Sequence, residues 1–349
     1  MLPYLTDRKI RIAVVGCGRI SKNHFDAIAE HEKDVELSAV CEDDPERLKE
    51  MTARYAVPGY SNLDELLAAK KADAIVLCTP SGLHPDQTVK GAMAGVHVIT
   101  EKPMATRWAD GLRMVKACDE ANVRLFVVKQ NRRNATLQLL KRAMDEKRFG
   151  RVHMVHLNVF WTRPQAYYDQ GAWRGTWELD GGALMNQASH YVDLLEWLIG
   201  PIADIQAMTS THRDIEVEDT GVMNVRWRNG ALGSMAVTMC TYPKNYEGSI
   251  TIIGEQGTAR VGGVAVNEIQ TWDFADTRDY DKDVREASYQ TTSVYGFGHP
   301  GYYKNIVDVF RGVAEPETDG REGLKSLEVL IGAYLSARDG KTVSLPLEY

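Results

Sequence analysis

The stretch Ile12–Ser21, which reads IAVVGCGRIS, decides the fold of the first part of the chain. An apolar run of strand character ends at Gly16, Gly18 follows two residues later, and a helical pattern begins at Ile20. Gly16 allows a sharp turn, and Gly18 leaves no side chain between the backbone and a bound group. The helix that follows offers free N–H groups and the positive end of its dipole. The stretch therefore predicts a strand, a tight turn and a helix that bind a phosphate, with Ser21 where a third glycine or alanine is usual.

The composition indicates a globular protein large enough for two domains, with 349 residues of which 44% are hydrophobic and 26% charged. The net charge of −7 disfavours a nucleic-acid-binding surface. No apolar run approaches the roughly 20 residues of a membrane span, and residues 1–9 lack the apolar core of a leader. The five cysteines are scattered, without metal or disulfide spacing. We expect a cytoplasmic protein that binds neither nucleic acid nor membranes.

An acidic residue follows the second predicted strand, residues 36–41. In a dinucleotide site, a carboxylate about 20 residues beyond the glycines accepts hydrogen bonds from the adenine ribose. Glu42 fits this position best. The alternative, a charge cluster at a helix N-terminus, suits Asp44 and Glu46. Because a carboxylate repels a 2′-phosphate, Glu42 predicts NAD rather than NADP as the cofactor.

Strand and helix patterns alternate up to about residue 130, which predicts an α/β domain with a doubly wound parallel sheet. Ligands bind at the carboxyl ends of the strands in such sheets. Two predicted strands, residues 74–78 and 96–100, end in loops that we expect at this edge. The candidate cofactor residues in these loops are Thr79, Pro80, Ser81, His84, Glu101 and Lys102.

The pattern changes after Gly150, where longer strand candidates follow one another. They are residues 152–160, 221–228, 232–241, 249–253 and 268–272. One helix is predicted at 183–199, and two more, at 302–311 and 324–337, are expected to pack back on the first domain. We predict a doubly wound α/β domain at 1–131 and, at 132–349, a second domain with a mostly antiparallel sheet.

Lys102 is the first candidate catalytic residue. In a turn facing a cofactor crevice, partial desolvation and a cationic nicotinamide would lower its pKa toward neutrality. Lys102 could then accept a proton from a substrate hydroxyl while hydride leaves the same carbon. The alternative is an ordinary surface lysine, and its position favours the catalytic interpretation.

Asn186 and His190 are four residues apart, so on a helix they would share one face. Both could contact a sugar, with His190 as a proton donor or an alternative base. The alternative is a hydrogen-bonded structural histidine, which an isolated histidine more often is.

Aromatic residues and two arginines are concentrated in residues 161–177. Arg163 could bind a carboxylate or phosphate through two hydrogen bonds, and the rings could stack on a ligand. The alternative is an aromatic cluster in a core or a subunit interface. His24, His97, His153 and His156 have no metal-like spacing, and the sequence assigns no metal site.

Together these stretches resemble the glucose–fructose oxidoreductase/inositol dehydrogenase (Gfo/Idh/MocA) family. The motifs that carry the resemblance are GCGRI at 16–20, CTPSGLH at 78–84, EKPMA at 101–105 and GG…H from 181 to 190. The resemblance implies a Rossmann domain at 1–131, followed at 132–349 by an α+β domain with an open, mostly antiparallel sheet. It places Lys102 and His190 at the reacting carbon. It also implies an oligomer, with a homotetramer expected, because the open sheet is commonly a subunit interface in this family.

The resemblance implies a set of binding residues. The cofactor set is Gly16, Gly18, Arg19, Ile20, Glu42, Thr79, Pro80, Ser81, His84, Glu101, Lys102 and Gln130. The substrate set is Lys102, Asn131, Arg163, Tyr167, Asn186, Gln187 and His190. Many members carry Asp where this chain has Asn186, and the neutral amide should leave Lys102 easier to deprotonate.

The segments at 128–133, 161–168, 173–177 and 186–190 look very like one subgroup, the UDP-N-acetylglucosaminuronate 3-dehydrogenases of bacterial surface polysaccharide synthesis. This resemblance implies NAD-dependent oxidation of a UDP-sugar at C3. Arg163 would bind the uronate carboxylate, and the amides of Asn186 and Gln187 would bind the N-acetyl group. The alternatives are a dehydrogenase of another sugar or polyol, and a nucleotide sensor without catalysis.

Overall fold

The computed structural model describes residues 4–291, 294 and 296–347. The chain divides into two compact units. The first comprises residues 1–129 and His299–Leu324, and the second Gln130–Gly298 and Lys325–Tyr349. The chain therefore leaves the first unit two residues before the expected boundary at 131, and it returns to that unit for one segment near the C-terminus.

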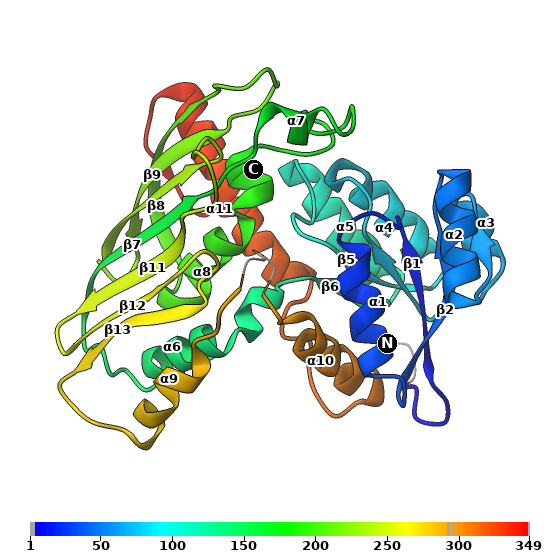
Figure 1. The fold of residues 1–349 in the computed structure, drawn as a ribbon, viewed down its shortest axis with the longest axis horizontal. Coiled ribbons are helices and arrows are strands. Elements are labelled where there is room, and N and C mark those ends of the chain that lie inside the picture. The colour runs from blue at the N-terminus through cyan, green and yellow to red at the C-terminus, as the bar shows by residue number, and fades with distance from the viewer. Residues whose placement is uncertain (1–3, 292–293, 295, 348–349) are drawn as a thin grey trace. The chain divides into compact units, whose positions relative to one another are not determined.

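Six strands of the described first unit form one parallel sheet, in the order β3-β2-β1-β4-β5-β6 (Figure 1). They are β1 (Ile10–Val15), β2 (Val35–Cys41), β3 (Gly59–Tyr60), β4 (Ala74–Leu77), β5 (His97–Thr100) and β6 (Leu125–Val127). The strand order reverses between β1 and β4, which pair in parallel from Ile12 with Ala74 to Val15 with Leu77. This is the doubly wound topology that the alternating pattern predicted, and in this topology ligands bind at the carboxyl ends of strands such as β1 and β4.

The helices of the first unit connect these strands and bury both faces of the sheet. They are α1 (Ser21–Glu30), α2 (Pro45–Tyr55), α3 (Leu63–Ala68), α4 (His84–Met93), α5 (Trp108–Glu120) and α10 (His299–Arg311), with a 3₁₀ turn η1 (Ser81–Leu83). α1 packs against α10, while α4 packs against α3 and α5. Strand residues such as Ile12 and Val14 are fully buried together with Phe25 of α1 and Ile306 of α10. A strand buried on both faces needs a nearly continuous apolar run, which explains the IAVV sequence.

The second unit has an eight-stranded sheet among its described residues, in the order β13-β12-β11-β7-β10-β9-β8-β14. The strands are β7 (Val152–Phe160), β8 (Ile202–Ser210), β9 (Thr220–Trp227), β10 (Leu232–Thr238), β11 (Glu247–Gly254), β12 (Gly257–Gly262), β13 (Glu268–Phe274) and β14 (Val343–Ser344). β7 and β10 pair in parallel, and the other neighbours are antiparallel. The sheet is open, and the predicted α+β class with a mostly antiparallel sheet is confirmed.

Helices cover one face of this second sheet (Figure 1). The helical segments of the unit are η2 (Gln130–Arg133), α6 (Ala135–Asp145), α7 (Gln165–Tyr168), η3 (Ala183–Gln187), α8 (Ser189–Ile199), η4 (Asp279–Asp283), α9 (Val284–Ala287) and most of α11 (Gly320–Asp339). The indole N–H of Trp227 on β9 donates to the carbonyl of Leu195 on α8 at 3.2 Å. The backbone N–H of Ala207 on β8 donates to Ser336 Oγ on α11 at 2.9 Å.

Two details differ from the sequence prediction. The expected continuous helix at 183–199 is a π-helical turn, η3, followed after Ala188 by α8. Asn186 and His190 therefore lie on different helical segments rather than on one regular face. The last expected helix lies in the second unit from Lys325 onward, because its small and apolar residues, such as Gly332, pack near Ile205 of β8 and Val343 of β14.

β8 and β12 were not predicted, because β8 has alternating but weakly apolar residues and β12 is short and rich in glycine. Among the described residues, no helix has the length and apolar character needed to cross a membrane.

Candidate active site

The two glycines of the first turn occupy different environments. Gly16 has a φ of +84°, and an added Cβ would lie 3.0 Å from the backbone of Cys78 and Thr79. At Gly18 an added Cβ would meet no atom within 4 Å. α1 begins at Ser21 without a side-chain cap on its first N–H groups, and Ser21 Oγ donates to the Gly18 carbonyl at 2.7 Å. The open space at Gly18 and the uncapped helix N-terminus fit a pyrophosphate.

Glu42 and Asp44 follow β2 and have separate roles. Glu42 is 5% exposed, and its Oε2 accepts from the Cys17 N–H of the glycine turn at 2.7 Å. Asp44 instead caps α2 by accepting from the backbone N–H groups of Glu46 and Arg47 at 3.0 Å. Glu42 thus lies beside the glycine turn, as a ribose-binding carboxylate requires. The alternative role, a charged residue at a helix N-terminus, is that of Asp44.

The loop after β4 is tied to the turn after β5 through His84. This histidine is 1% exposed, and its ring nitrogens lie 2.9 Å from the Thr79 carbonyl and 3.1 Å from the Pro103 carbonyl. Burial lowers the pKa of His84. Thr79 Oγ1 donates to Gln87 at 2.6 Å. His84 therefore holds the two loops together, and Pro80 and Ser81 form the start of η1 between them.

Lys102 lies directly after the buried Glu101, at the carboxyl end of β5. The Lys102 side chain is half-buried, and its backbone N–H donates to Glu101 Oε2 at 3.1 Å. Arg19 is exposed and Ile20 is half-buried at the start of α1. All the predicted cofactor residues except Gln130 thus belong to the first unit, together with Lys102.

The remaining predicted residues lie in the second unit, His190 among them. Gln130 is fully buried, and its Nε2 lies 2.9 Å from Nε2 of His190. Because an amide nitrogen only donates, this ring nitrogen accepts. Asn131 is 3% exposed, and its Oδ1 has no hydrogen-bond partner among the described residues. A buried acceptor of this kind is a candidate contact for a ligand.

Arg163, Tyr167 and Gln187 form one network. Arg163 Nε donates to Gln187 Oε1 at 3.0 Å, and Gln187 Nε2 donates to the Tyr167 hydroxyl at 3.2 Å. Arg174 donates to the same hydroxyl at 2.8 Å, and Arg163 Nη1 donates to the Thr162 carbonyl at 2.7 Å. The oxygen and the nitrogen of the Gln187 amide thus both make hydrogen bonds within the protein.

Asn186 has a carboxylate partner that sequence reasoning missed. Its Nδ2 donates to Asp180 Oδ1, and Asp180 Oδ2 accepts from the Gly175 N–H at 2.7 Å. Asp180 is 2% exposed. Because an ionised carboxylate only accepts, the Asn186 nitrogen must face Asp180, and the amide oxygen faces the other way. The sequence offered no indication of this pair, since Asp180 lies in an irregular loop.

Glu218 and Tyr334 hold the π-helical turn that carries Asn186 and Gln187. Glu218 Oε1 accepts from the Leu184 N–H and from the Tyr334 hydroxyl, both at 2.9 Å. The Met185 N–H donates to the Tyr334 hydroxyl at 3.1 Å. Burial raises the pKa of Glu218 to about 7. Neither residue was predicted, because they are separated from the turn by about 30 and 150 residues.

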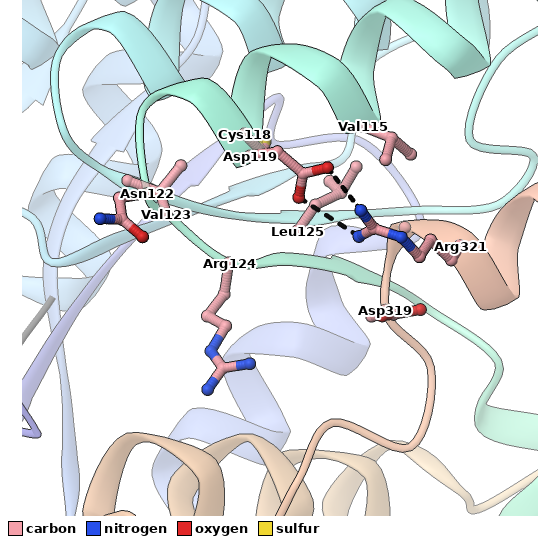
Figure 2. A pocket seen from close by; sticks show the side chains of 10 residues that line it. Val115, Cys118, Asp119, Asn122, Val123, Arg124, Leu125, Asp319 and Arg321 are labelled. Carbon is pink, nitrogen blue, oxygen red and sulfur yellow. Dashed lines mark hydrogen bonds and ion pairs between the residues drawn. The ribbon is translucent and has the colours of Figure 1, made fainter. Parts of the chain in front are cut away.

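A separate pocket lies at the amino end of β6, between the end of α5 and the start of α11 (Figure 2). Arg321 pairs with Asp119 through two hydrogen bonds at 2.6 and 3.2 Å. The predicted cofactor residues follow the carboxyl ends of the strands, which is the opposite edge of the parallel sheet. The lining of this pocket contains none of the predicted site residues.

Three buried side chains lie together next to the Lys102 turn, and Glu101 is one of them. Ligand-type atoms of His24, Glu101 and His299 lie within 4.8 Å of one another. Sequence spacing could not reveal this group, because His24 and His299 come from opposite ends of the chain.

The fold is that of a two-domain oxidoreductase that uses a nicotinamide dinucleotide. The chain belongs to the Gfo/Idh/MocA oxidoreductase family: residues 10–129 match its NAD-binding Rossmann fold and residues 141–345 its C-terminal alpha/beta domain. The resemblance inferred from the motifs and the prediction of NAD as cofactor are confirmed.

Two solved structures are similar over the full length. They are the WlbA dehydrogenases of Chromobacterium violaceum and Bordetella pertussis, each in complex with NADH and UDP-GlcNAcA. Each is 63% identical to this chain, with a TM-score of 0.96. The alignment with the Chromobacterium protein covers 100% of this chain and 99% of that protein. The alignment with the Bordetella protein covers 99% of this chain and 100% of that protein. A D-apiose dehydrogenase of Paraburkholderia graminis is 25% identical, covering 97% of this chain and 91% of that protein.

Proposed function

We propose that this protein oxidises the C3 hydroxyl of UDP-N-acetylglucosaminuronate to the 3-keto sugar nucleotide, with NAD as the hydride acceptor. The observation that carries this proposal is the 63% identity, over the whole chain, to two dehydrogenases whose structures contain NADH and UDP-GlcNAcA. Relatives that act on other sugars, such as the D-apiose dehydrogenase, are 25% identical.

The first unit would hold the cofactor. The space at Gly18 suits the pyrophosphate, and Glu42 would accept hydrogen bonds from the adenine ribose. When bound, NAD accepts the hydride from C3. Lys102 would take the hydroxyl proton, and its half-buried position at the carboxyl end of β5 supports this role.

The second unit would orient the sugar. Arg163 is the proposed partner of the uronate carboxylate, and Gln187 would act through it by holding its Nε. Asn186 would present its amide oxygen, since its nitrogen is bound to Asp180. Tyr167 and Asn131 would line the sugar site, and His190, held by Gln130, would complete it.

We infer a homotetramer in the cytoplasm as the working form. Support for association comes from the sheet face opposite the helices, where Met154 and Leu232 are paired neighbours and are 50% and 54% exposed. The 3-keto product would serve synthesis of a diacetamido-uronic acid for surface polysaccharide such as lipopolysaccharide O-antigen.

The direct test mixes purified protein, NAD and UDP-N-acetylglucosaminuronate, and follows nicotinamide absorbance with and without 2-oxoglutarate. We expect NADH to form. Its amount relative to enzyme distinguishes release of NADH from a bound cofactor that 2-oxoglutarate recycles. No absorbance change in either mixture, with binding of both ligands established by calorimetry, would refute the proposed reaction.

Two variants separate the proposed roles. Lys102→Met should nearly abolish turnover while the protein still binds NAD, because the proton acceptor is lost. Arg163→Ala should reduce the preference for the uronate over UDP-N-acetylglucosamine by about 10- to 100-fold, since a charge-assisted hydrogen bond is lost. Equal activity of Arg163→Ala on the uronate would instead favour another sugar as the substrate.

A further inference from the structure

A buried group of polar side chains from three elements lies next to the turn that carries Lys102. Glu101 follows β5, His24 lies on α1, and His299 and Tyr303 lie on α10. Glu101 is 4% exposed, His299 is 3% exposed, and His24 and Tyr303 are inaccessible. Buried ionisable groups are costly unless they are paired, so this group requires an explanation.

The hydrogen bonds of this group all lead toward Glu101, which is the final acceptor. Glu101 Oε1 lies 3.0 Å from His24 Nε2, and His24 Nδ1 lies 2.8 Å from the Tyr303 hydroxyl. Because an ionised carboxylate only accepts, the ring proton of His24 is on Nε2, and the bare Nδ1 accepts the proton of Tyr303. Glu101 Oε2 accepts from the backbone N–H of Lys102 at 3.1 Å. The chain Tyr303–His24–Glu101 therefore ends on the turn that carries Lys102.

The hydrogen-bonded series Tyr303–His24–Glu101 leaves one negative charge inside the protein, on Glu101. Burial lowers the pKa of His24, so the ring is neutral, and burial raises the pKa of Tyr303 well above its usual value. Burial alone would raise the pKa of Glu101, but hydrogen bonding from His24 and the proximity of His299 bring it well below its usual value. Glu101 thus accepts from the His24 ring at 3.0 Å and from a backbone N–H at 3.1 Å, and the His299 ring lies slightly farther away at 3.6 Å.

The titratable groups that face Glu101 come from every element around it. They are His24 on α1, His299 and Tyr303 on α10, Cys78 and His84 after β4, and Lys102 in its own turn. Lys102 is the one strong base among them. The carboxylate follows β5, one residue from Lys102, at the edge of the sheet where ligands bind in this topology.

We propose that Glu101 supplies a fixed negative charge that favours bound NAD⁺ over bound NADH, and that His24 and Tyr303 are positioning residues that keep this carboxylate ionised and aimed at the Lys102 turn. The oxidised nicotinamide ring carries a positive charge that the reduced ring lacks, so a nearby carboxylate distinguishes the two forms. The inference rests on the NAD site of the proposed function but not on its sugar substrate.

A metal ion is the competing explanation, because two imidazoles and a carboxylate can bind Zn²⁺ or Fe²⁺. His299 Nε2 lies 3.6 Å from Glu101 Oε1 and has no hydrogen-bond partner among the described residues. However, the 3.0 Å separation of His24 Nε2 and Glu101 Oε1 is an ordinary hydrogen-bond length. A metal would also have to displace the ring proton that this bond uses. The geometry favours the proton.

The test measures NAD⁺ and NADH affinities separately, by calorimetry on the full-length protein. In Glu101→Gln, the ratio Kd(NAD⁺)/Kd(NADH) should rise about fivefold, as expected for a unit charge roughly 8 Å away through an effective dielectric constant of about 40. Glu42→Gln is the matched control, because the adenine ribose is the same in both forms. This control should weaken the binding of NAD⁺ and of NADH equally and leave the ratio of their Kd values unchanged.

His24→Phe provides a second, independent arm that leaves the Glu101 carboxyl in place. Without the donor from His24, the pKa of Glu101 should rise, so the carboxyl becomes neutral as pH falls. The affinity ratio should then rise toward the Glu101→Gln value at low pH, whereas the wild-type ratio stays flat between pH 6 and pH 8. The acid limb of the pH profile of turnover should also differ between wild type and Glu101→Gln. It should lie at lower pH in the variant, because the pKa of Lys102 should be lower there.

Three results would overturn the proposal. The first is an unchanged affinity ratio in a folded Glu101→Gln protein. The second is a pH-independent ratio in His24→Phe equal to that of wild type. The third is a stoichiometric metal, found by elemental analysis, that disappears in His299→Ala. Failure of sugar oxidation with an altered affinity ratio would refute the proposed substrate and leave this inference standing.

Discussion

A single added carbon atom has different consequences at the two glycines of the first turn. Gly16 combines a φ of +84° with tight contacts to the backbone of Cys78 and Thr79. Gly18 lies in open space and has no such backbone requirement. The first glycine therefore serves the fold, and the second leaves room for the ligand.

Gly16→Ala should lower the free energy of unfolding by about 1–3 kcal/mol, because a Cβ is strained at this φ and crowded at 3.0 Å. Gly18→Ala should unfold like the wild type but lose at least about tenfold in NADH affinity, since its Cβ occupies the pyrophosphate space. Denaturant unfolding and calorimetry measure the two effects. Equal NADH affinity of Gly18→Ala and wild type would contradict the placement of the pyrophosphate.

At the scale of elements, the turn η3 depends on a buried carboxyl from another part of the sheet. Glu218, just before β9, binds the Leu184 N–H, and its Oε2 lies so close to Gly182 that a Cβ there would be 1.7 Å away. Tyr334 of α11 bridges Glu218 and Met185. A residue with any side chain at 182 would displace this carboxyl and with it the turn that carries Asn186.

Glu218 should make stability depend on pH. Burial raises its pKa from 4.5 to about 7, so the folded state binds the proton more tightly than the unfolded state. The contribution of Glu218 is therefore greatest below about pH 4.5 and is lost as pH rises through about 7. The unfolding free energy of Glu218→Gln relative to wild type should increase by about 2–3 kcal/mol between pH 5 and pH 8.

Denaturant unfolding of both proteins at several pH values checks this expectation. Glu196, whose pKa burial also raises to about 7, titrates in both proteins, so the difference between them isolates Glu218. A difference that is constant with pH would show that Glu218 is already ionised in the folded state.

At the scale of the whole molecule, the second sheet has one face covered by helices and one with exposed apolar side chains. Met208 of β8, Met154 of β7 and Leu232 of β10 are 68%, 50% and 54% exposed. Exposed apolar side chains on several strands of one sheet are typical of a surface that another subunit covers. The first unit, which holds the predicted NAD residues, is not part of this sheet.

Leu232→Asp should therefore reduce the size of the assembly in light scattering while NADH affinity stays within about twofold of wild type, because a buried charge in an interface is costly. Met93→Asp is the control, since Met93 is 82% exposed at the end of α4 in the first unit. This control should leave the assembly unchanged. An unaltered assembly in Leu232→Asp would exclude this face as the interface.

The sequence by itself determined the features that depend on neighbouring residues. The IAVV run, the two glycines and the helix after them specify the first turn, and the alternating patterns specify a doubly wound sheet. That Glu42 and Lys102 lie just after strands of the parallel sheet could be predicted from the strand patterns, and their roles stay predictions. The family could likewise be inferred, since its motifs are contiguous.

Tertiary structure alone decided how the predicted side chains are held. Asp180 orients Asn186, and Gln187 joins Arg163 to Tyr167. Asn186 and Gln187 lie on η3, whereas their partners come from other segments of the chain. The start of η3 is held by Glu218, whose carboxyl accepts from the Leu184 N–H of the first helical turn, a group that has no partner within the helix. The pairing of His24 with Glu101 spans 77 residues, and His299 joins them from near the C-terminus. Sequence periodicity reports which side of an element is buried, whereas the partner of a buried polar group depends on which distant segments pack together.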